Sequence, residues 1–202
     1  MKATYPKKWS DVTLDQYYNL CEAISMDWDN DTDRALAMLS ALSGVSIKAL
    51  NEEVSTTDLI KAISDIAFIG EGKPKGSPSP TLKVGNRKFI VDLILRESSA
   101  SSFISLSEYA KDSETAKVNI HNVMSVFCYE ANWWGGRKKR TIQTQKEIAE
   151  YFKHNMTMDK AFIYSGFFLT SFQALYKAML GYSELKQKEA MKLLKKEIAR
   201  NL

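Results

Sequence analysis

The sequence predicts a mainly α-helical fold that contains one β-hairpin. Apolar side chains recur at helical spacing over most of the 202 residues, whereas β-branched residues gather around residues 81–92. A composition of 45% hydrophobic and 26% charged residues is typical of a globular protein that buries a core. These patterns divide the chain into an N-terminal helical unit at 1–72, a linker and hairpin at 73–101, and a C-terminal helical region at 102–202.

Four short helices are expected in the N-terminal unit. The run Thr-Leu-Asp-Gln at 13–16 is a capping box, so the first helix begins there. A second helix begins at Asp31 and ends at Gly44, a third begins at Ser46, and a fourth begins at Thr56 or Thr57. The residues predicted on the inner side of the fourth helix are Leu59, Ile60, Ile63, Ile66 and Ala67.

The middle of the chain contains a linker followed by a hairpin. Residues 70–80 hold three of the four prolines, which is typical of a linker or surface loop. Two β-branched runs then flank Gly85 and Asn86, which favour a tight turn. A lone hairpin is marginally stable, so we expect it to pack on helices or to pair with a strand of a neighbouring subunit. Its apolar residues Phe89 and Val91 are therefore interface candidates.

Helical spacing returns in the C-terminal region. The predicted helices cover about residues 103–110, 114–130, 144–153, 158–180 and 184–201. The most apolar of them, 158–180, is interrupted by Asp159, Lys160 and Lys177. A membrane span needs about 20 consecutive apolar residues, so we expect a buried central helix and no membrane span.

Charge is distributed unevenly along the chain. The net charge is −6 over residues 1–72, +2 over 73–136 and +8 over 137–202, which leaves only +4 overall. The total lacks the strong basic excess of a dedicated nucleic-acid binder. The asymmetry indicates head-to-tail contact between copies, contact with an acidic surface, or solvated helix faces that differ in sign.

No residue pattern predicts an enzyme, a cofactor or a metal site. The carboxylates at 27–33 are spaced like the start of a calcium loop, but Thr32 and Met38 replace the required Gly and Glu. The glycines near residue 72 lack the order of a phosphate loop. His121 and Cys128 lie too far apart on one predicted helix to act as base and nucleophile.

The most unusual local sequence is Trp-Trp-Gly-Gly-Arg-Lys-Lys-Arg at 133–140. In a nucleic-acid binder, the indoles stack on bases and the cations neutralise phosphates. In a subunit interface, the indoles form an anchor surrounded by basic contacts. A third interpretation packs both indoles in the chain's own core. The interface candidates in this segment are Trp133, Trp134, Arg137, Lys138, Lys139 and Arg140.

Three segments carry a family resemblance. Residues 9–18 read Trp-Ser-Asp-Val-Thr-Leu-Asp-Gln-Tyr-Tyr, residues 35–46 read Ala-Leu-Ala-Met-Leu-Ser-Ala-Leu-Ser-Gly-Val-Ser, and a Leu/Ile-rich helix ends with Ala-Phe-Ile at 67–69. This pattern resembles the N-terminal helical module of small tail-assembly chaperones and of head-to-tail or tail accessory proteins of tailed bacteriophages. It covers residues 9–69 and carries no catalytic residue.

The resemblance implies a non-enzymatic viral protein, a structural component of the neck, head-tail connector or tail of a phage particle. Such a protein is expected to form homo-oligomers and to contact other phage structural proteins, without a cofactor. A tail-assembly chaperone that is not retained in the particle and a nucleic-acid-binding accessory protein stay open as alternatives. The expected location is the virion, after assembly in the host bacterial cytoplasm. A count of only two cysteines agrees with a reducing compartment, and no apolar segment predicts a signal peptide at the N-terminus.

Overall fold

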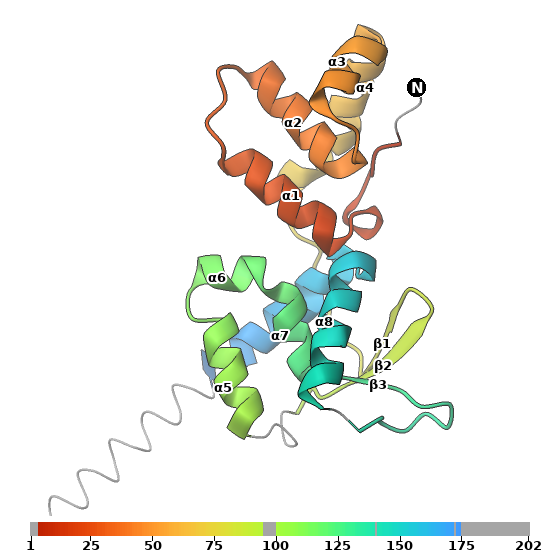
Figure 1. Cartoon of the computed structure of the whole chain (residues 1–202), viewed down its shortest axis with the longest axis vertical. Helices are drawn as coiled ribbons and strands as arrows, with labels where there is room; N and C mark the ends of the chain where they lie inside the picture. The colour runs from red at the N-terminus through yellow and green to blue at the C-terminus, as the bar shows by residue number, and fades with distance from the viewer. Residues whose placement is uncertain (1–3, 95–99, 140, 172, 175–202) are drawn as a thin grey trace, which may run out of the picture. The chain divides into compact units, whose positions relative to one another are not determined.

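The computed structural model describes residues 4–94, 100–139, 141–171 and 173–174. As predicted, the described part is mainly α-helical, and it contains one small antiparallel sheet (Figure 1). The chain divides into two compact units, Met1–Ser165 and Gly166–Leu202. Every helix and strand labelled in Figure 1 lies in the first unit.

The N-terminal elements follow the predicted order. They are η1 (Trp9–Asp11), α1 (Leu14–Ser25), α2 (Asp31–Ser43), α3 (Ile47–Glu53), α4 (Thr56–Asp65) and η2 (Ile66–Glu71). Thr13 and Gln16 form the predicted capping box at the start of α1. Asn30, rather than Asp31, caps α2, and Gly44 ends that helix with a φ of 72°, in the left-handed region that favours glycine.

The predicted inner face of α4 is wrong in part. Ile60 is 64% exposed and Ile63 is also exposed, whereas Ala62 and Ile66 are buried. Ala62 and Ile66 lie four residues apart and therefore share one side of the helix. The apolar pattern alone did not distinguish this side from the neighbouring one, and α4 consequently presents two isoleucines to solvent.

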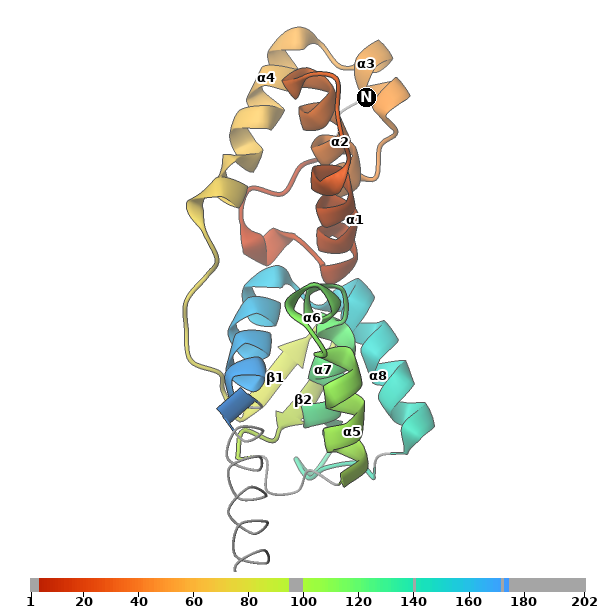
Figure 2. The same cartoon turned by 90° about the vertical axis from the view of Figure 1, so that its left-hand side faces the viewer.

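The predicted hairpin is present and gains a third strand from the same chain. Strands β1 (Thr81–Val84), β2 (Arg87–Val91) and β3 (Cys128–Glu130) are antiparallel in the order β1-β2-β3. Figure 2 shows residues 72–80 running as an extended segment from η2 to β1. The outer edge of β2 thus pairs with β3 rather than with a neighbouring subunit.

The third strand also corrects the predicted helix over 114–130. The structure contains α6 (Ser113–Val118) and α7 (Ile120–Phe127), separated at Asn119, and the last three residues belong to β3. A helix continued through these residues would leave the backbone of the β2 edge without its present partners. This long-range pairing overrides the helical spacing of the sequence.

The core contains buried side chains from the sheet and from the helices that follow it. Helices α5 (Ala100–Tyr109) and α8 (Ile142–Asn155) complete the labelled elements. Phe89 on β2 and Phe152 on α8 are both fully buried, with ring centroids 4.7 Å apart. Residues 158–171 are helical, which agrees with the predicted helix as far as it is described, while 175–180 and the predicted helix at 184–201 lie outside the described residues. Within the described residues no helix has the length and hydropathy of a membrane span.

The first helices contact residues that follow α8. The backbone of Leu14 donates a hydrogen bond to Met156, and that of Met158 donates to Val12. The Trp9 ring packs edge-on against Phe162 with centroids 5.1 Å apart. Residues on both sides of position 72 thus belong to one compact unit.

Candidate functional site

A short hairpin arm continues beyond β3. We call residues 131–139 the tryptophan arm. Ala131 and Arg137 form an antiparallel bridge, and the backbone N–H of Asn132 donates to the carbonyl of Gly136 over 2.8 Å. The Gly136 N–H donates in turn to the Asn132 side chain over 2.7 Å. Gly135 has a φ of 83°, which lets the chain reverse direction within the arm. The tip is therefore a hydrogen-bonded turn.

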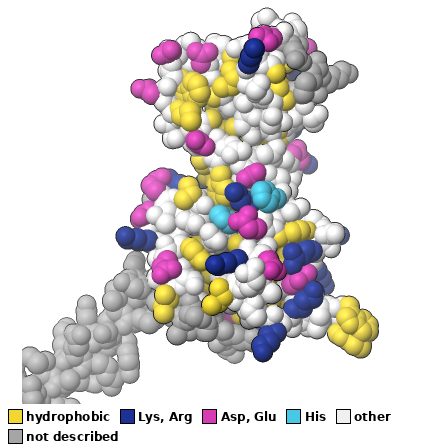
Figure 3. Space-filling model, in the orientation of Figure 1, with side chains coloured by type: hydrophobic (Ala, Val, Ile, Leu, Met, Phe, Trp, Pro, Cys, Tyr) yellow, Lys and Arg dark blue, Asp and Glu magenta, His cyan; other side chains and the backbone are white. Residues whose placement is uncertain are grey.

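Both tryptophans lie at the exposed tip of this arm. Trp133 is 81% exposed and Trp134 is 74% exposed. Their rings are stacked, with centroids 3.4 Å apart and an interplanar angle of 26°. In Figure 3 a hydrophobic projection stands out beside Lys and Arg side chains, where Figure 1 places the loop between β3 and α8. Of the three interpretations of the tryptophans, packing in the chain's own core disagrees with this exposure.

The base of the arm is held by charged and aromatic contacts. The guanidinium of Arg137 lies 4.8 Å from the ring centroid of Tyr129, a cation-π distance. The Glu130 carboxylate lies 2.9 Å from Arg87 and 3.1 Å from Lys138. The hydrogen bond from Arg87 and the one from Lys138 together lower the pKa of Glu130. Two cations of the arm thus also serve to orient it.

Two basic interface candidates, Lys139 and Arg140, remain to be placed. Lys139 is exposed. Arg140 lies outside the described residues.

The two hairpin candidates do not belong to this surface. Phe89 is fully buried and Val91 is nearly so, and both face the chain's own core. Val91 pairs with Cys128 of β3, and the Phe89 ring packs against Phe152. Their role as interface residues is therefore corrected: the hairpin packs its apolar face into the chain's own core, where Phe89 lies against Phe152 of α8.

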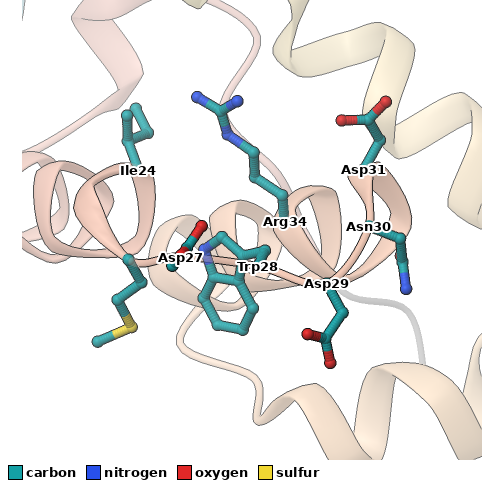
Figure 4. A pocket seen from close by; sticks show the side chains of 8 residues that line it. Ile24, Asp27, Trp28, Asp29, Asn30, Asp31 and Arg34 are labelled. Carbon is teal, nitrogen blue, oxygen red and sulfur yellow. The ribbon is translucent and has the colours of Figure 1, made fainter.

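A pocket lies at the connection between α1 and α2. We call it the acidic loop pocket, and Figure 4 shows its lining. It has a volume of about 520 Å³ and is lined by Ile24, Met26, Asp27, Trp28, Asp29, Asn30, Asp31 and Arg34. The indole N–H of Trp28 donates to the Ala23 carbonyl over 2.7 Å, which fixes one wall. Asn30 caps α2 and fixes the other end of the loop.

The pocket combines apolar and acidic character. Ile24 and Met26 are exposed apolar residues beside the half-buried Trp28. In Figure 4 the Trp28 ring and the Asp29 carboxylate extend to one side of the loop, and Arg34 extends to the other. The three carboxylates outnumber the one guanidinium, so the lining carries a net negative charge. In the sequence these carboxylates predicted no pocket, because the exposure of Ile24 and Met26 beside them is visible only in the structure.

Metal-binding side chains do not cluster in the part of the chain that the structure describes. Within residues 4–94, 100–139, 141–171 and 173–174, no group of three His, Cys, Asp or Glu side chains can hold a metal ion. His121 contacts Tyr18, with Nδ1 2.8 Å from the phenolic oxygen. Cys128 is buried in β3. The tryptophan arm is therefore the feature that sequence and structure both single out.

Comparisons with known proteins add no relative. No family model matches the chain, and neither the curated proteins nor the solved structures contain a significant match.

Proposed function

We propose that this chain is a non-enzymatic structural component of a tailed-phage particle, in the neck, head-to-tail or tail region, and that it acts through protein–protein contacts. The resemblance of residues 9–69 to phage tail and neck accessory proteins supports the phage setting. The observation that carries the contact-based function is the exposure of both indoles at the hydrogen-bonded tip of the tryptophan arm.

The arm has the properties of an interface anchor. Tryptophan is enriched among residues whose truncation costs about 2 kcal/mol or more of binding free energy. Here two indoles are held against each other and on a turn with two cross-turn hydrogen bonds, so little conformational entropy is lost when a partner covers them. Arg137 and Lys138 follow the turn and add charged groups at the base of the arm, as in the polar rim of an interface.

Binding of nucleic acid is the second candidate, and the same geometry supports it less. A base-stacking platform offers aromatic faces, but each indole here turns one face toward the other. Arg137 lies over Tyr129, and Lys138 pairs with Glu130, so both cations already have partners within the chain. Steeply salt-dependent binding of a single-stranded oligonucleotide would favour this candidate.

Analysis of purified particles tests the proposed function. Mass spectrometry of virions is expected to find peptides of this chain, and Trp134→Ala is expected to reduce its incorporation while the isolated chain stays folded. Ile142→Ala is the matched control, because Ile142 is 79% exposed and lies outside the arm. Peptides found in assembling lysates and absent from virions would favour the tail-assembly chaperone instead.

A further inference from the structure

We propose that the tryptophan arm of one copy of this chain docks into the acidic loop pocket of a second copy. The inference rests on the proposed function, since it takes the arm to be a protein anchor, and it names the partner of that anchor. Two features of the chain that the fold leaves exposed are thereby explained by one contact.

The pocket is large enough for an indole, and three of its eight lining residues, Ile24, Met26 and Trp28, are apolar or aromatic. Its volume of about 520 Å³ lies within the range of about 300–1,000 Å³ that is typical of binding pockets. Ile24 and Met26 offer exposed apolar surface, and a thioether makes favourable contacts with aromatic rings. The Trp28 ring adds an aromatic wall whose position is fixed by its hydrogen bond to Ala23.

The charges of the two surfaces are complementary. The pocket presents Asp27, Asp29 and Asp31 against one Arg34, whereas the arm carries the exposed Lys139 beside Lys138, which already pairs with Glu130. The positive charge of the arm attracts it to the acidic pocket of the second copy. The basic surfaces of that copy repel it.

The contact is intermolecular and joins two different surfaces. Figure 1 places the connection between α1 and α2 on one side of the first compact unit and the loop between β3 and α8 on another, so an arm does not reach the pocket of its own chain. A contact in which one patch of each copy meets a different patch of the next is heterologous, and it generates a ring or a helical filament.

A mixing experiment with full-length variants tests this arrangement. The arm variant carries Trp133→Ala and Trp134→Ala, and the pocket variant carries Asp27→Lys and Asp29→Lys. Sedimentation velocity of the wild type is expected to show self-association, which each variant weakens by roughly 30-fold or more, the factor that corresponds to about 2 kcal/mol. An equimolar mixture of the two variants is expected to form a 1:1 dimer and nothing larger, because only one intact arm and one intact pocket remain.

Matched variants control for surface changes of the same kind. Ile60→Ala removes an exposed apolar side chain on α4, and Glu52→Lys reverses an exposed charge on α3, and both are expected to associate like the wild type. Circular dichroism verifies that each variant is folded. Should the double pocket variant misfold, the charge exchange Asp29→Lys mixed with Lys139→Glu is expected to restore an association that either change alone weakens.

Three results overturn the inference: a wild type that stays monomeric at all concentrations, an arm variant that associates normally, or a mixture that contains no heterodimer. A monomeric wild type whose Trp134→Ala form still fails to enter virions would leave the proposed function standing with a different partner. Normal incorporation of Trp134→Ala into virions would remove the anchor role and this inference together.

Discussion

The phenolic hydroxyl of Tyr18 on α1 lies 2.8 Å from Nδ1 of His121 on α7, although the two residues are 103 positions apart. The same oxygen accepts a hydrogen bond from the backbone N–H of His121 over 3.3 Å. Burial raises the pKa of Tyr18. The tautomer of the His121 ring sets which partner donates in the bond between the hydroxyl and Nδ1. One side chain thus joins α1 to α7 through two hydrogen bonds.

Tyr18→Phe is expected to lower the free energy of unfolding by about 1–3 kcal/mol. The change leaves Nδ1 and the backbone N–H of His121 without their partner in a part-buried site, and unpaired buried polar groups are costly. Tyr5→Phe is the matched control, because the buried Tyr5 hydroxyl has no hydrogen-bond partner among the described residues. Urea unfolding measures the free energy of unfolding of both variants. Equal effects of the two changes would contradict a stabilising role for the Tyr18 bonds.

Stability is expected to fall as the pH drops below about 6.5, the ordinary pKa of a histidine. Burial lowers the pKa of His121 in the folded chain; Glu150 raises it by a smaller amount, and Lys153 and His154 lower it further. In this window the unfolded chain binds a proton at residue 121 that the folded chain does not. Unfolding is therefore favoured as pH falls from 6.5 toward the folded pKa, by up to about 1.4 kcal/mol per pH unit.

An NMR titration of the His121 ring and urea unfolding at several pH values check this expectation. The ring is expected to titrate below the ordinary histidine value, and His121→Gln is expected to flatten the loss of stability between neutral and mildly acidic pH. A ring that titrates at or above 6.5 would refute the prediction.

Local signals in the sequence were sufficient where the structure is local. The capping box at Thr13 and the C-cap at Gly44 depend on neighbouring residues only, and both are present. The strand at Cys128–Glu130 depends on a partner about 40 residues away, with Phe89 opposite Glu130, and helical spacing concealed it. Phe89 and Val91 were assigned to an interface because their burial also depends on distant residues, such as Phe152 on α8.

The sequence did not predict whether the two tryptophans are buried or exposed. In sequence, two large aromatics followed by two glycines are compatible with a buried cluster, an anchor or a stacking platform. The bridge between Ala131 and Arg137 explains why the two indoles are exposed. This bridge closes a short hairpin whose turn contains Trp133 and Trp134.

Gly85→Ala is expected to destabilise the chain more than Gly44→Ala. Both glycines have positive φ, 52° and 72°, so either alanine is strained by about 1–2 kcal/mol. A Cβ at Gly85 would also lie 2.6 Å from the Tyr151 hydroxyl, whereas a Cβ at Gly44 meets no atom within 4 Å. That hydroxyl donates to the Val84 carbonyl over 3.0 Å and would have to move.

Thermal and urea unfolding of the two glycine variants measure this difference. Tyr151→Phe in the Gly85→Ala background separates the two causes, because it removes the clashing oxygen and leaves the backbone strain. The combined variant is expected to lose less stability than the sum of the two single changes. Full additivity would show that the close approach of Tyr151 contributes nothing.

Phe89→Ala and Trp133→Ala are expected to act in opposite ways on folding and assembly. Phe89 is fully buried against Phe152, and removal of a buried phenylalanine costs about 3–5 kcal/mol through lost burial and the cavity that remains. Trp133 is 81% exposed, so its truncation is expected to change the free energy of unfolding by less than about 0.5 kcal/mol. Urea unfolding of both variants, with sedimentation of the folded Trp133→Ala protein, measures the two effects separately. If Trp133→Ala unfolded the chain as strongly as Phe89→Ala, the indole would be part of the core, and the arm could not be the anchor on which the proposed function rests.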